Sequence, residues 1–141
     1  MEGVAVLADS QGGNTKKIAR AIAEELGIVP GEITGPVPED AQLLFLGSGT
    51  YSNHAPGGGM MRFIRNGDFA GRRVALFGSA SYENDGQRMI GILAEALEKK
   101  GATVIGVGGG RGRLFVLRNG RTHPEDLEGA KEFARGVAKS G

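Results

Sequence analysis

The residues best suited to bind a ligand form a short, uncharged segment near the start of the chain, called here the first segment. Its members are Ser10, Gln11, Gly12, Gly13, Asn14 and Thr15. They offer two hydroxyls, side-chain amides and successive backbone N–H groups, which can hold a phosphate at a helix N-terminus without a cationic side chain. The segment lacks both the lysine of a Walker loop and the glycine spacing of a dinucleotide site, so a monophosphate is favoured. The alternative is an ordinary glycine turn with Asn14 or Thr15 as the helix N-cap.

Two further segments of mostly small residues contain the two tyrosines of the chain. The second segment consists of Ser48, Gly49, Thr50, Tyr51, Ser52, Asn53 and His54. The third segment consists of Ser79, Ala80, Ser81 and Tyr82. Each of the three segments follows directly on an apolar run.

These apolar runs are typical of strands buried on both faces of a sheet. They cover residues 4–7, 43–46 and 74–77, and a similar run covers 103–107. A weaker strand candidate at 28–33 is interrupted by Pro30 and Gly31. Residues 114–117 are either the hairpin partner of the 103–107 strand or its continuation.

Helical spacing of apolar residues separates the strands. A helix is predicted from Asn14 or Thr15 to Leu26, where Gly27 ends it, and a short one is predicted around residues 60–64. Residues 89–97 form another, which ends at a basic pair and a glycine. The last begins with Thr122 or His123 as N-cap, followed by Pro124 at the first turn.

Alternating strands and helices predict an α/β fold with a doubly wound parallel sheet and helices on both faces. We expect one domain over residues 1–141, with five strands in the order 2-1-3-4-5, in which strand 2 is residues 28–33. Ligands of such sheets bind beyond the carboxyl ends of the strands. All three segments lie at that edge.

Composition excludes several kinds of site. The 141 residues contain no cysteine, which excludes disulfides, thiolate zinc sites, iron–sulfur clusters and a catalytic thiol. A net charge of +1 gives no overall attraction to nucleic acid. No apolar stretch approaches the roughly 20 residues of a membrane span, so a cytoplasmic location is expected. We expect neither a metal site nor catalytic residues.

The three segments together resemble the binding loops of the flavodoxins. The first segment matches their Ser/Thr-x-Thr-Gly-x-Thr phosphate loop at five of six positions, with Gly12 in place of threonine. Residues 47–51 are similar to the Gly-Ser-Pro-Thr-aromatic loop of the family, with Gly49 in place of proline. Residues 112–127 look like the C-terminal strand and helix of short-chain members.

The resemblance implies a flavodoxin-like fold that binds flavin mononucleotide (FMN) and carries single electrons between redox partner proteins, a reductase donor and an acceptor. It implies that the first segment holds the phosphate and that Tyr51 and Tyr82 contact the isoalloxazine ring. The rest of the second and third segments would contact the ribityl chain and the pyrimidine edge. A glycine peptide that flips toward reduced flavin in flavodoxins corresponds here to Gly57, Gly58 or Gly59.

Two other functions stay open on the sequence. The first is an FMN-dependent NAD(P)H:quinone-type reductase with His54 or Tyr82 near the flavin. The second is a binding module that has kept the fold and lost the cofactor, as Gly12 and Gly49 suggest. His54 is otherwise a solvated loop histidine. Five arginines either ring the flavin or are solvated: Arg62, Arg65, Arg72, Arg73 and Arg88.

Overall fold

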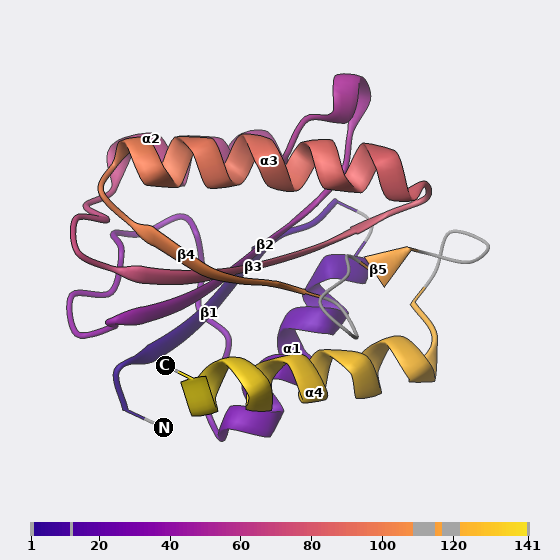
Figure 1. Ribbon diagram of the computed structural model, residues 1–141, viewed down its shortest axis with the longest axis horizontal. Coiled ribbons are helices and arrows are strands. Elements are labelled where there is room, and N and C mark those ends of the chain that lie inside the picture. Colours follow the sequence, from indigo (N-terminus) through magenta and orange to yellow (C-terminus); the bar gives the residue numbers. More distant parts are fainter. Residues whose placement is uncertain (1, 12, 109–114, 117–121, 141) are drawn as a thin grey trace.

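The centre of the protein is a sheet of parallel strands between two layers of helices (Figure 1). The computed structural model describes residues 2–11, 13–108, 115–116 and 122–140. The four main strands are β1 (Val4–Asp9), β2 (Leu43–Gly49), β3 (Arg73–Ala80) and β4 (Thr103–Gly108). They stand in the order β1-β2-β3-β4, and all neighbours pair in parallel. Every residue of β2 is buried, as an apolar run in the middle of a sheet requires.

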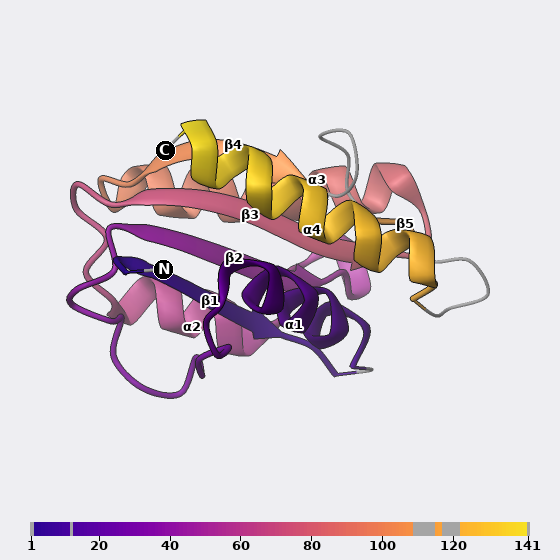
Figure 2. The same cartoon turned by 90° about the horizontal axis from the view of Figure 1, so that it is seen from below.

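Helices cover both faces of the sheet (Figures 1 and 2). The helices α1 (Asn14–Leu26) and α4 (Pro124–Ser140) lie on one face, and α2 (Gly58–Asn66) and α3 (Glu83–Lys99) lie on the other. Successive side chains of a strand point to opposite faces of the sheet and so contribute to the hydrophobic cores on both faces. For example, Leu44 packs with α2 and α3, whereas Phe45 packs with α1 and α4. No helix within the described ranges combines the length and apolar character that a membrane crossing requires.

The predicted strand at residues 28–33 contracts to a single bridge. Gly31 pairs in parallel with Leu7, and its N–H donates to the Val6 carbonyl at 2.8 Å. Pro30 has no N–H to donate, which limits pairing on either side of that bridge. The bridge lies beside β1, the place that the predicted order 2-1-3-4-5 gives to the second strand. The predicted fold class is therefore confirmed, with this strand much reduced.

A short strand, β5 (Phe115–Val116), settles the alternatives for residues 114–117. It pairs in parallel with Ser79 and Ala80 of β3. The pairing of β4 with β3 ends at Phe77, just before these residues. The strand therefore continues the line of β4 along β3 and is not its hairpin partner. The glycines from 109 to 112 lie outside the described residues.

Candidate functional site

Parallel register brings the carboxyl ends of β1, β2 and β3 to one edge of the sheet. Asp9 pairs with Ser48, and Gly49 pairs with Ser79. The three predicted segments follow these strand ends, so the structure gathers them as the sequence predicts.

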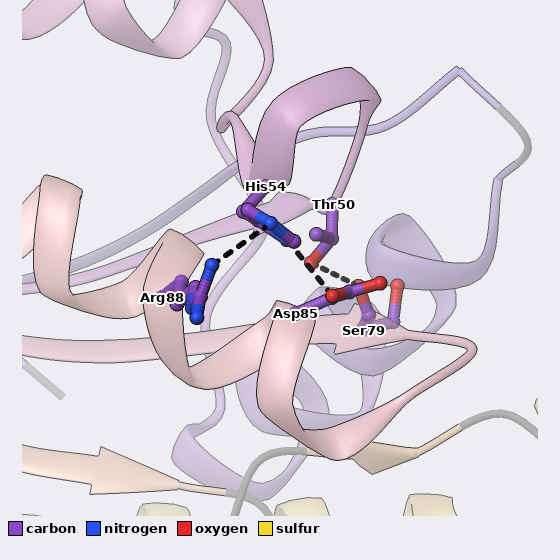
Figure 3. A network of polar contacts seen from close by, with 5 residues as sticks. All are labelled: Thr50, His54, Ser79, Asp85 and Arg88. Carbon is purple, nitrogen blue, oxygen red and sulfur yellow. Dashed lines mark hydrogen bonds and ion pairs between the residues drawn. The ribbon is translucent and has the colours of Figure 1, made fainter.

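Hydrogen bonds through Ser79 join all three segments. The hydroxyls of Ser79 and Thr15 are 2.8 Å apart, and both residues are almost completely buried, at 4% and 0% exposed. The Thr50 hydroxyl donates to the Ser79 carbonyl at 3.0 Å (Figure 3). Because Ser79 bonds through both its side chain and its backbone, it fixes the first and second segments relative to the third.

The start of α1 has the features of an anion site. Its N-cap is Gly13, with φ of 86°, so neither Asn14 nor Thr15 is the cap. Gly13 donates its N–H to Ser10 Oγ at 2.9 Å and offers no side-chain cap of its own. Within α1, which is described in full, the first turn contains no acidic residue, and Lys16 and Lys17 are exposed. The first-turn N–H groups and the positive end of the helix dipole therefore lie beside the loop, and no acidic residue of that first turn neutralises them.

The side chain of Asn14 serves a role that the sequence did not suggest. Its Oδ1 accepts hydrogen bonds from the backbone N–H of Thr122 at 2.9 Å and from the Thr122 hydroxyl at 2.8 Å. This contact ties the first segment to the start of α4. At the start of α4, Asp126 Oδ2 accepts the N–H of His123, as in a capping box, so His123 and not Thr122 is the N-cap of α4. Gly12, the position that departs from the phosphate-loop pattern, lies outside the described residues.

Asp9 is a functional residue that the sequence reasoning missed. Its Oδ2 accepts the N–H of Met60 at 2.9 Å, so the carboxylate caps the first turn of α2. A Cβ at Gly57 would lie 2.1 Å from Asp9 Oδ2, which only glycine avoids. The sequence feature that could have identified Asp9 is its position directly after an apolar run, at the end of a predicted strand.

The glycines proposed for a peptide flip are therefore used differently. Gly57 donates its N–H to Ser48 Oγ at 2.8 Å, and Gly58 and Gly59 form the first turn of α2. Ser48 is fully buried and donates its own hydroxyl to the Gly49 carbonyl. These contacts place the three glycines at the start of α2, and a flip at these positions stays a prediction.

Tyr51 joins the second segment, to which it belongs, to the first. Its hydroxyl oxygen accepts the N–H of Gln11 at 2.9 Å. A Cβ at Gly49 would lie 2.7 Å from the same oxygen, so the phenol occupies the space that a side chain at position 49 would need. The departure from proline at Gly49 thus has a local reason, and a backbone N–H of the first segment points toward an oxygen acceptor.

The second segment continues into a tight turn at residues 52–55, the element η1 (Ser52–His54), which has the i to i+3 hydrogen bond of a 3-10 turn but the opposite backbone hand at Asn53 and His54. Ala55 donates to the Ser52 carbonyl at 3.3 Å, and Tyr51 donates to the Ala55 carbonyl at 2.9 Å. Asn53 and His54 both have φ of 60°, the left-handed region that residues with a Cβ rarely adopt.

His54 is not a freely solvated loop residue. Its Nδ1 lies 2.8 Å from Asp85 Oδ1, and its Nε2 lies 3.2 Å from Arg88 Nη1 (Figure 3). Asp85 and Arg88 both belong to the first turns of α3. The structure therefore fastens the turn of the second segment to the helix that follows the third.

The rest of the third segment opens outward from Ser79. Ala80 is buried at 4% exposed, Ser81 is exposed, and Tyr82, just before α3, is 71% exposed. The ring of Tyr82 is therefore available to a ligand or to another protein.

The five arginines do not gather around this edge. Arg88 contacts His54 of the second segment. Arg72 bonds the carbonyls of Pro38 and Ala41, and Arg73 begins β3, both at the amino end of the sheet.

The family model named Flavodoxin matches residues 6–131. No curated protein sequence is similar enough to count as a match. Among solved structures, flavodoxin 2 from Bacillus cereus is 26% identical, with a TM-score of 0.74 over 98% of this chain and 99% of that one.

Two more solved structures share the fold at lower identity. A flavodoxin from the domain Archaea has a TM-score of 0.76 at 21% identity and covers 97% of this chain and 96% of its own. The flavodoxin of Fusobacterium nucleatum, solved with FMN bound, has a TM-score of 0.75 at 18% identity over 99% of both chains. The similarity therefore extends over nearly the full length of this chain and of each of these proteins.

Proposed function

The chain belongs to the flavodoxin family, and from this premise we propose that its three strand-end segments bind FMN. It is an FMN electron-transfer protein and not an enzyme. When bound, FMN supplies the ability to accept and release electrons one at a time. We propose that residues 1–141 form a single domain.

The observation that carries the proposed site is the start of α1, where backbone N–H groups meet two hydroxyls and no carboxylate. Phosphate would supply the negative charge that this helix end lacks. The residues proposed to bind it are Ser10, Gln11, Gly12, Gly13, Asn14 and Thr15. Asp9, which would repel phosphate, is engaged by the N–H of Met60.

The ring and ribityl chain of FMN would lie along the second and third segments. Tyr51 and Tyr82 would offer flat ring faces to the flavin, and Ser81 is exposed beside Tyr82. The remaining residues proposed for these contacts are Ser48, Gly49, Thr50, Ser52, Asn53, His54, Ser79 and Ala80. In this arrangement the Tyr51 hydroxyl leaves the Gln11 N–H, which becomes a donor to the phosphate.

The protein transfers electrons to redox partners. We propose a reductase as the donor and a separate acceptor protein, both docking where Tyr82 exposes 71% of its surface. A cytoplasmic location stays a prediction, which cell fractionation tests.

A titration with FMN and with riboflavin tests the proposed site. Both contain the same ring, so only the first reports on the phosphate loop. FMN should bind with quenched fluorescence, and riboflavin should bind at least tenfold more weakly. NADPH alone should leave the bound flavin oxidised, whereas addition of a reductase should bleach it. Absence of FMN binding, or equal affinity for the two flavins, would contradict the proposed phosphate site.

A further inference from the structure

The contacts of His54 select one form of its imidazole ring (Figure 3). The Arg88 guanidinium has donors only, so its 3.2 Å contact with Nε2 is a hydrogen bond only when Nε2 accepts. The ring proton then lies on Nδ1 and is donated to Asp85 Oδ1, 2.8 Å away. When the ring is neutral, Asp85 and Arg88 together therefore favour its Nδ1–H tautomer.

The backbone conformation of His54 explains why its side chain needs these two contacts. Two successive positive φ angles, at Asn53 and His54, are those of a type I′ turn. Glycine is the usual residue at the second central position of that turn, because it has no Cβ to clash. Histidine in this place needs contacts that hold it there, and the two α3 residues supply them.

The turn is continuous with the proposed flavin site. Tyr51 closes it by donating to the Ala55 carbonyl, and Thr50 bonds the third segment through Ser79. Among the described residues, the charged groups in contact with His54 are Asp85 and Arg88. Neither belongs to the three segments proposed to bind FMN.

We propose that Asp85 and Arg88 are positioning residues, which fix the His54 ring and thereby the turn at residues 52–55 against α3. The orientation of the Asn53–His54 peptide toward the flavin edge is then set from outside the flavin site. The flavin part of this inference rests on the proposed function. The equilibrium between oxidised and reduced protein thus depends on side chains of α3 that do not touch the cofactor.

The first experiment needs no flavin. Nitrogen-15 NMR should show His54 as the Nδ1–H tautomer in the wild type. Asp85→Ala should release that tautomer and speed amide exchange at Tyr51 and Ala55 at least tenfold, and Arg88→Met should act in the same direction. Glu95→Ala is the matched control, because Glu95 is an exposed acid on α3 paired only with Lys99 among the described contacts. It should leave both readouts unchanged.

The second experiment measures the one-electron reduction potentials of the FMN-loaded protein. His54→Gly keeps a residue that adopts positive φ freely and loses the link to α3 without changing the formal charge of a neutral imidazole. It should change at least one of the two reduction equilibria tenfold or more, which is 59 mV for one electron. The Glu95→Ala control should stay at the wild-type potentials.

The outcomes separate this inference from the proposed function. A wild-type His54 without the Nδ1–H tautomer, or unchanged exchange in Asp85→Ala, would overturn the positioning role. Faster exchange combined with wild-type potentials in His54→Gly would overturn its influence on the flavin. If the chain bound no FMN, the proposed function would fail, and the first experiment would still decide whether Asp85 and Arg88 position the turn.

Discussion

The buried pair of Thr15 and Ser79 gives the sharpest test of how the site is held together. Thr15→Val keeps the shape of the side chain and removes the hydroxyl that lies 2.8 Å from Ser79 Oγ. Ser79 is 4% exposed, so its hydroxyl would lose its partner where water cannot easily replace it. Leaving a buried hydroxyl without a partner costs about 1–3 kcal/mol. For a chain of this length, that loss lowers Tm by roughly 3–12 °C.

The double variant Thr15→Val/Ser79→Ala decides whether the hydrogen bond is the cause. Removing both hydroxyls leaves neither unpaired, so the double variant should be more stable than the sum of the two single effects by about 1–2 kcal/mol. Urea unfolding of the four proteins, with and without FMN, measures this coupling. Additive single effects would refute the reasoning, because they would mean that the two hydroxyls do not interact.

Three further predictions concern the neighbouring contacts. Gly57→Ala places a Cβ against Asp9 and should lower the free energy of unfolding in urea by about 1–3 kcal/mol. Gly58→Ala is the control, because its Cβ would meet nothing within 4 Å, and it should not destabilise the fold. Equal effects of the two substitutions would contradict the crowding at Gly57. Tyr51→Phe removes a competitor of phosphate for the Gln11 N–H and should tighten FMN binding about fivefold, from about 1 kcal/mol of net hydrogen bond. Unchanged affinity in a fluorescence titration would argue against that competition. FMN at 100 times its Kd should raise the free energy of unfolding by about 2.7 kcal/mol, and an unshifted thermal transition would exclude binding to the folded state alone.

The elements of this fold could largely be predicted from local patterns. The apolar runs mark β1 to β4, and the left-handed Gly27 ends α1 where the sequence predicts. The prediction of a full strand at residues 28–33 was wrong, because Pro30 interrupts the pairing and only Gly31 forms a bridge with β1. Strand ends and helix starts are local properties, so a single sequence reveals them well.

The contacts inside the site could not be predicted in the same way. The partner of Asn14 is Thr122, and the partner of Asp9 is Met60, which lies 51 residues along the chain. Such pairs depend on how separate loops meet after the sheet has formed. The sequence identified the segments that meet, and the structure determined which side chains in them bond to one another.

The bond between Thr15 and Ser79 also orders events in time on the ribosome. The two residues are 64 positions apart, and at about 5–20 residues per second the ribosome needs roughly 3–13 s to make the intervening chain. During that interval α1 and its glycine loop exist without the third segment that fixes them. A nascent chain therefore completes the proposed cofactor site only after β3 has been made and has joined β2. At that site FMN would stabilise the folded chain late and would not act as a template for its first steps.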